Sequence, residues 1–381
     1  MRLLVFYLTG LTWAIYSCSN VFFMLAPYLV MRGFSSENAG ILVGAFYAAT
    51  TLVRPLGSWI AERAGIRRAL AASACVCLFS TLLMFFAASF WLFLAIRVAM
   101  GLGFGVFVVA LMTCQSLLIP GEVRGGTFAV ITLGSLSCLF TVLPLADWFL
   151  SRGEAGLFLA IPVVTSALCL IFSWRFPAVS GTLRVAGKWG TWGDLYREIP
   201  VWRTILTCLF FGLCDAAIVC IPSLALSMGL IPSFFAVANG LGALVMRTMG
   251  RDFFNRHPRY LFIGPSLFVM ALFLYLTTEA VNNVWLFACG FFNGMGMGYG
   301  FPALLALIGD LAPERLRAKM SSLVYFCYDV SWFVLPVYIG FATPLVGEMG
   351  AFRSLAALCL TAGVGVALMW RSGSKAILPN C

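Results

Sequence analysis

The chain has 381 residues, of which 62% are hydrophobic and only 10% are charged, and its formal net charge is +10. A soluble globular protein of this length needs a polar surface that so few charged residues cannot supply, so the composition excludes that class. Apolar runs of about 20 residues, long enough to cross a bilayer as helices, recur from end to end, whereas a membrane β-barrel would show short alternating strands.

These apolar runs predict twelve transmembrane helices in two sets of six. The first set covers about residues 4–30, 38–60, 69–89, 91–118, 127–149 and 156–174. The second set covers about residues 202–226, 231–250, 260–278, 283–308, 320–342 and 351–370. We therefore expect an all-α integral membrane protein with a six-helix bundle in residues 1–174, a cytoplasmic linker in residues 175–200, and a second six-helix bundle in residues 201–381.

Lysine and arginine gather on alternate connections, which predicts the orientation of the helices. If the N-terminus is cytoplasmic, only Arg32, Arg152 and Arg353 fall on the outside. We therefore expect a multi-pass protein of the cytoplasmic (inner) membrane, with both termini in the cytoplasm. This bias accounts for the positive charge, so no nucleic-acid partner is expected. The expected surroundings are the lipid bilayer, and we expect a monomer.

The chain repeats itself at an offset of about half its length, which predicts two similar bundles with a ligand site between them. Three stretches share this offset. Residues 54–57 return as 247–250; Gly101, Gly103 and Gly105 return as Gly294, Gly296 and Gly298; Pro120 and Arg124 return as Pro313 and Arg317.

A basic segment follows the second predicted helix and reads GSWIAERAGIRR over residues 57–68. It resembles the loop motif of the major facilitator superfamily, Gly-x-x-x-Asp-Arg-x-Gly-Arg-Arg. The resemblance implies a conformational latch that opens as the halves rock, formed by Gly57, Glu62, Arg63, Gly65, Arg67 and Arg68. A second copy of the motif matches less well, because Asn255 stands in the place of the acid. In this copy the latch residues are Gly250, Asn255 and Arg256. A basic loop that only sets topology is the alternative.

The fourth predicted helix contains a second match, RVAMGLG over residues 97–103, which resembles the Arg-x-x-x-Gly-x-Gly motif of the same superfamily. An arginine inside an apolar helix costs several kcal/mol unless it is paired or faces water. We therefore interpret Arg97 as a residue for proton coupling or substrate binding. The alternative is that Arg97 reaches the outer headgroups, because Trp91 marks the membrane edge nearby.

Two acids lie near the middle of the membrane in predicted helices, Asp215 in the seventh and Asp329 in the eleventh. Asn20 precedes Pro27 by the same seven residues that separate Asp215 from Pro222, so Asn20 and Asp215 form a pseudo-symmetric polar pair. Burial in a low-dielectric medium favours the protonated form of a carboxylate. The two acids, together with Arg97, are therefore candidates for proton coupling, while a packing role is the alternative.

Three aromatic residues of the eleventh helix, Tyr325, Tyr328 and Trp332, share a face with Asp329 at spacings of three and four. With Asn20 they are the predicted lining of the substrate cavity, although plain helix packing explains the same spacing. The fifth helix departs from the superfamily's antiporter motif Gly-Pro-x-x-Gly-Gly, because residues 142–148 read VLPLADW and keep only the proline. This departure leaves the direction of transport open.

The resemblance covers nearly the whole chain and implies the twelve-helix major facilitator fold with alternating access. The expected function is proton-coupled export of a small organic solute, with an uptake symporter or facilitator as the alternative and a non-transporting sensor as a third possibility. No nucleotide-binding or HExxH sequence is present, and the only histidine is His257. We therefore expect neither an enzyme nor a metal site, and no cofactor.

Overall fold

A computed structural model describes residues 2–119, 124–176, 191–199, 201–249, 258 and 260–377. These described residues form helices and their connections, with no strand among them. The chain divides into two compact units, Met1–Arg184 and Val185–Cys381, and each unit is considered by itself. Residues 177–190, which hold most of the expected linker, lie outside the described part of the chain.

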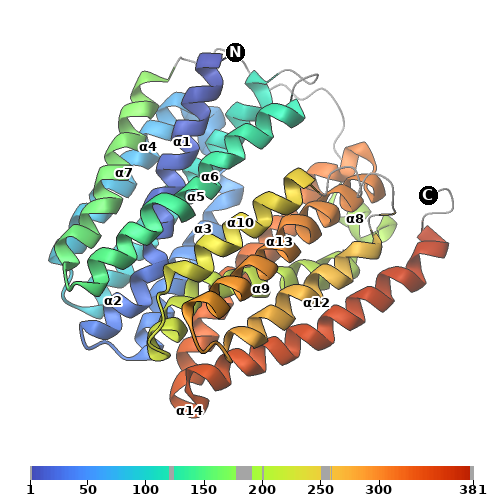
Figure 1. The fold of residues 1–381 in the computed structure, drawn as a ribbon. Coiled ribbons are helices and arrows are strands. Elements are labelled where there is room, and N and C mark those ends of the chain that lie inside the picture. The colour runs from blue at the N-terminus through green and yellow to red at the C-terminus, as the bar shows by residue number, and fades with distance from the viewer. Residues whose placement is uncertain are drawn as a thin grey trace. The chain divides into compact units, whose positions relative to one another are not determined.

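The first unit contains six membrane-length segments (Figure 1). Its helices are α1 (Arg2–Asn20), η1 (Val21–Met24), α2 (Leu25–Met31), α3 (Ser36–Ala64), α4 (Ile66–Leu83), η2 (Met84–Phe86), α5 (Phe90–Leu118), α6 (Arg124–Ser151) and α7 (Ala155–Arg175). The first three of these follow one another without a break and make one span of 30 residues. In this unit α5 packs against α3 and α4, while α1 packs against α6 and α7.

The second unit repeats this arrangement. Its helices are α8 (Trp192–Glu198), α9 (Val201–Ser227), α10 (Ser233–Met249), α12 (Tyr260–Thr277), α13 (Asn283–Leu311) and α14 (Glu314–Ile377). Here α13 packs against α10 and α12, and α9 packs against α14. These are the counterparts, in chain order, of the contacts that α5 and α1 make in the first unit.

The last helix, α14, supplies two spans because the chain reverses within it (Figure 1). Gly347 has a φ of 73° and is the point at which helical geometry is interrupted. The hydroxyl groups of Tyr338 and Ser354 lie 2.6 Å apart, although 16 residues of straight helix would separate them by about 24 Å. The described residues contain nine segments that are long and apolar enough to cross a membrane, in agreement with the predicted all-α membrane fold.

The sequence repeat corresponds to repeated contacts between helices. A Cβ atom on Gly101 would lie 2.3 Å from the carbonyl oxygen of Phe46, and one on Gly294 would lie 2.0 Å from that of Asn239. Phe46 and Asn239 are separated by the same offset as the two glycines. Gly101 therefore permits close approach of α5 to α3, and Gly294 permits the corresponding approach of α13 to α10.

One connection differs from its prediction. The basic segment at residues 57–68 was expected as a loop, but α3 continues to Ala64 and α4 begins at Ile66. Gly65 alone separates the two helices, with a φ of 82° that favours glycine. The charged residues of this segment therefore lie on helical turns that extend beyond the apolar spans.

The three arginines predicted to lie outside all have partners within the protein. Arg32 donates a hydrogen bond of 2.9 Å to the carbonyl oxygen of Ala87. The Arg152 guanidinium lies 4.0 Å from the ring centre of Trp148. Arg353 forms a half-exposed ion pair with Glu279 at 2.6 Å.

Candidate functional site

The second unit brings a carboxylate and a phenol together where α9 and α14 meet closely. A Cβ atom on Gly212 would lie 2.7 Å from that of Ser331 and 3.0 Å from the carbonyl oxygen of Tyr328. Ser331 also donates a hydrogen bond of 2.9 Å to the carbonyl oxygen of Leu209, across the same contact. Because Gly212 has no side chain, α14 approaches α9 closely, and Asp215, one turn further along α9, meets Tyr328.

The hydroxyl of Tyr328 donates a hydrogen bond to Oδ2 of Asp215. Arg247, near the end of α10, interacts electrostatically with both of these groups. Asp215 and Tyr328 are half-buried, whereas Arg247 as a whole residue is exposed. Three ionisable side chains from α9, α10 and α14 therefore form one polar cluster, which we call the Asp215 cluster.

Aromatic rings lie beside the Asp215 cluster. The ring of Phe301, from α13, lies 4.7 Å from that of Tyr328 and 6.4 Å from that of Tyr325, centre to centre. Tyr328 is also 6.2 Å from Trp332. The three aromatic residues predicted to share a face of the eleventh helix are thus brought together, and Phe301 joins them.

The second predicted acid, Asp329, is buried with 9% of its surface exposed. It follows Tyr328 in α14, so it projects about 100° further round the helix. It interacts electrostatically with Tyr328 but is not part of the hydrogen bond to Asp215. Both acids therefore lie near Tyr328, and its hydroxyl donates to Asp215.

In the first unit, Asn20 bridges the corresponding helices. Its amide nitrogen donates to Sγ of Cys138 at 2.9 Å, which links the end of α1 to α6. The Asp215 hydrogen bond likewise links α9 to α14. The pair is therefore similar in position, but the first unit has neutral groups where the second has a carboxylate.

Arg97 lies inside the first unit, with 2% of its surface exposed, so it does not reach the outer headgroups. Its Nε donates to the carbonyl oxygen of Leu42 at 3.2 Å, and Nη1 lies 3.7 Å from Sδ of Met100. The guanidinium is 4.6 Å from the ring centre of Phe46 and 5.0 Å from that of Phe22. Aromatic faces attract a cation and offset part of the cost of burying it.

The described part of the predicted latch belongs to α3 and α4. Gly57 packs against Val109, with 3.1 Å between an added Cβ and the Val109 side chain. The guanidinium of Arg67 donates to the carbonyl oxygen of Trp174 at the end of α7, and Arg63 and Arg68 are exposed. The side chain of Glu62 and all of the second copy, Gly250, Asn255 and Arg256, lie outside the described residues.

Two charged residues of interest were not selected from the sequence. Asp147 in α6 has 5% of its surface exposed, and it lies near the end of the predicted helix at residues 127–149. Arg247 was recognised only as a repeat of Arg54. Its approach to Asp215 depends on contacts between α9 and α10, which no spacing within one helix reveals.

Comparison with known proteins identifies the family. The family model of the Major Facilitator Superfamily matches residues 8–336 and 225–379. A search of curated proteins finds no match.

Three solved structures of transporters share the fold. A POT family transporter in complex with a thioalcohol-conjugated peptide is 12% identical with a TM-score of 0.83, and the match covers 99% of this chain and 97% of that one. The nucleoside transporter NupG is 11% identical with a TM-score of 0.76, covering 97% and 99%. A bacterial homologue of the human lysosomal transporter Spinster is 15% identical with a TM-score of 0.74, covering 99% and 98%. The chain thus shares the fold of these transporters, and it belongs to the Major Facilitator Superfamily.

Proposed function

We propose that this protein is a secondary active transporter that exports a small organic solute across the cytoplasmic membrane in exchange for protons, with both termini in the cytoplasm. The observation that carries the proposal is the Asp215 cluster. It places a carboxylate, a phenol and a guanidinium from three helices of one unit in mutual contact or electrostatic range. Proton coupling needs such a group, because its charge must change the contacts between helices.

In this proposal a proton acts by neutralising Asp215. The ionised carboxylate accepts the Tyr328 hydrogen bond and attracts Arg247, so it ties α9 to both α14 and α10. A proton on Asp215 removes the attraction to Arg247 and weakens the charge-assisted hydrogen bond. The balance between two arrangements of these helices then depends on protonation, which is the requirement for coupling.

The remaining predicted residues have supporting roles in the proposal. Phe301, Tyr325 and Trp332 offer aromatic faces beside the Asp215 cluster, suited to an organic solute with a planar or cationic part. Asn20, which contacts Cys138 within the first unit, remains a proposed lining residue, and Arg97 and Asp329 are proposed to assist coupling. The segment at residues 57–68 and its weaker copy at residues 250–256 form the latch.

The test begins with a thermal-shift screen of small metabolites against the purified protein, followed by transport of the best ligand in proteoliposomes. We expect an imposed pH gradient to drive accumulation by the wild type. Asp215→Asn should abolish that accumulation while solute exchange without a gradient continues. Asp147→Asn, which changes a buried acid of the other unit, is the matched control. Full gradient-driven accumulation by Asp215→Asn would exclude the coupling role.

Uptake is the second candidate, and one observation favours it. Around Pro144, α6 lacks the glycines of the superfamily's antiporter motif. The polarity of the imposed gradient separates proton exchange, which export uses, from proton symport, which uptake uses. Accumulation driven by a more acidic vesicle interior supports exchange, whereas accumulation driven only by a more acidic exterior supports symport.

A further inference from the structure

Unit 1 has a cavity at the end where α3, α4 and α7 meet. Its volume is about 490 Å³. Its lining residues are Ala64, Gly65, Ile66, Arg67, Arg68, Ala71 and Trp174. Two guanidinium groups and an indole therefore border one hollow, together with small and apolar side chains.

The side chains divide this cavity into a cationic part and an apolar part. Arg67 and Arg68 lie on the first turn of α4, and both are exposed. Arg67 is held in place by its hydrogen bond to the carbonyl oxygen of Trp174, which fixes a guanidinium at the rim. The indole of Trp174 is 68% exposed, and Ile171, one turn deeper in α7, is 49% exposed.

The position of the cavity in the membrane narrows the class of ligand. The distribution of basic residues predicts that this end of unit 1 faces the cytoplasm. Exposed tryptophan is typical of the boundary between headgroups and acyl chains, and the apolar surface at Ile171 continues from it toward the membrane interior. Basic pockets between helices at this depth suit phosphate-bearing lipid headgroups.

We infer that this cavity binds the headgroup of an anionic phospholipid. Arg67 and Arg68 contact the phosphodiester, because a guanidinium offers paired N–H donors that match phosphate oxygens. Trp174 packs against the glycerol region, and the acyl chains run along the exposed surface of α7 past Ile171. The bound lipid links the start of α4 to the end of α7, the same two points that Arg67 already joins.

The test measures lipid retention by native mass spectrometry during titration of detergent-purified protein. The probes are phosphatidylglycerol, phosphatidylcholine and inorganic phosphate. We expect the wild type to bind phosphatidylglycerol more tightly than phosphatidylcholine. Arg68→Gln should weaken phosphatidylglycerol binding about fivefold, the change that corresponds to about 1 kcal/mol for one basic residue near an anionic surface. Arg67→Gln/Arg68→Gln should weaken it further.

Arg152→Gln is the matched control, because Arg152 also lies beside a tryptophan but at the predicted outer end. It should retain the affinity of the wild type. Arg68→Gln leaves the hydrogen bond from Arg67 to the carbonyl oxygen of Trp174 intact, so a folding defect is not expected to explain a loss of lipid binding in this variant. Unchanged affinity in both Arg68→Gln and the double variant would overturn the proposal. So would competition by inorganic phosphate at equal concentration, which would indicate a site for soluble phosphate.

Discussion

The Nε atom of Arg97 donates a hydrogen bond of 3.2 Å to the backbone carbonyl oxygen of Leu42. At the corresponding place in the second unit, a Cβ on Gly290 would lie 2.4 Å from the carbonyl oxygen of Phe235. The repeat therefore preserves the contact between corresponding pairs of helices, α3 with α5 and α10 with α13, but different groups occupy the contact in each unit. The first unit holds a buried cation there, and the second holds two backbones in close contact.

Replacing Gly290 with alanine should destabilise the protein, because the nearest atoms to the added Cβ all belong to the Phe235 backbone. Such overpacking costs about 1–3 kcal/mol. Gly365→Ala is the matched control, since no atom lies within 4 Å of its added Cβ. Thermal melting in detergent should show a lower midpoint for Gly290→Ala than for Gly365→Ala. Equal midpoints would show that α10 and α13 are not packed as described.

Replacing Arg97 with leucine should leave the melting midpoint unchanged or raise it. Desolvation of the buried guanidinium is only partly offset by its contacts with Leu42, Phe46 and Phe22, and an apolar side chain has no such cost. Gradient-driven transport should fall about tenfold or more, as expected for loss of a charge-dependent interaction. A large loss of thermal stability with retained transport would instead make Arg97 a structural residue.

Replacing Tyr328 with phenylalanine should reduce gradient-driven transport about tenfold, because a hydrogen bond to a charged group contributes about 1.5–3 kcal/mol. The aromatic contacts with Phe301 and Trp332 remain available to the new ring. Tyr338→Phe is the control, since it removes the hydroxyl that contacts Ser354 on the same helix. Initial rates in proteoliposomes provide the measurement, and equal rates for the two variants would contradict a role for the Tyr328 hydroxyl.

A buried amide pair should stabilise the second unit. The side chain of Asn239 donates to that of Asn293 at 2.9 Å, and Asn293 donates to the carbonyl oxygen of Met270 at 2.9 Å. A double-mutant cycle with alanine at both asparagines should give a coupling energy of about 0.6 kcal/mol, within a ceiling of about 1.7 kcal/mol. Melting of the four proteins measures this coupling. Strictly additive effects would show that the amides do not interact.

The sequence allowed the fold to be predicted because each span is long, apolar and part of a repeat. The contacts of Gly101 with Phe46 and of Gly294 with Asn239 show the repeat in three dimensions. The predicted end of the second helix, at residue 60, was wrong by several residues, because α3 ends at Ala64. Polar residues after the apolar span indicated a loop, but helical geometry continued until Gly65, where the backbone conformation interrupts it.

The candidate site could be predicted only in part. A polar residue in an apolar helix is visible in one sequence, so Asp215 and Arg97 were both selected. The partner of Asp215 is 113 residues away on another helix, and a helical pattern gives no information about such a pair. Proton coupling by Asp215, Asp329 and Arg97 and a cavity lined by Asn20 stay predictions, and the experiments above test Asp215 and Arg97.

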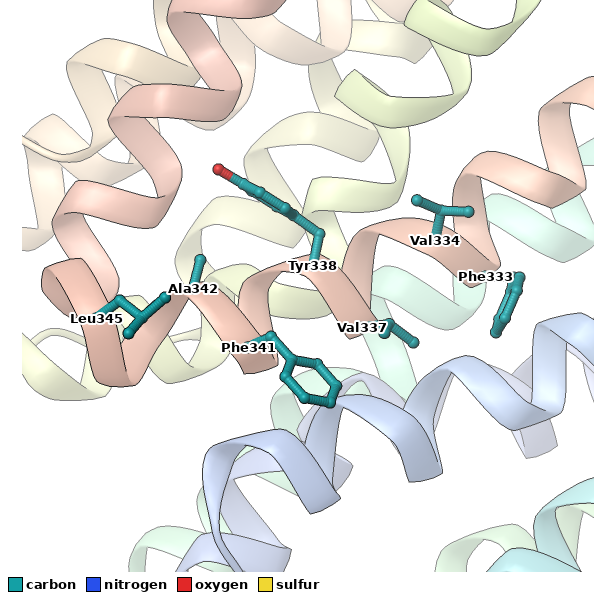
Figure 2. Close-up of a pocket in the computed structure, with 7 residues that line it drawn as sticks. All are labelled: Phe333, Val334, Val337, Tyr338, Phe341, Ala342 and Leu345. Atoms are coloured by element: carbon teal, nitrogen blue, oxygen red, sulfur yellow. The ribbon is translucent and has the colours of Figure 1, made fainter.

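Unit 2 has a long apolar surface beyond the Asp215 cluster, along the part of α14 that precedes its reversal (Figure 2). It borders a cavity of about 510 Å³. The lining side chains recur at spacings of one, three and four and are Phe333, Val334, Val337, Tyr338, Phe341, Ala342 and Leu345. Helical periodicity therefore continues almost to Gly347. The position of Gly347 in turn determines which side chains before the reversal contact which side chains after it.

This tight reversal makes the length of the chain around Gly347 critical. Helical geometry resumes directly after Gly347, so inserting or deleting one residue there would rotate the final span by about 100°. Phe352 and Ala356, which are fully buried, would then turn away from their packing partners. Single-residue length changes should therefore be tolerated poorly at this corner of the fold, even though it lies at the edge of the membrane, where connecting segments ordinarily vary in length.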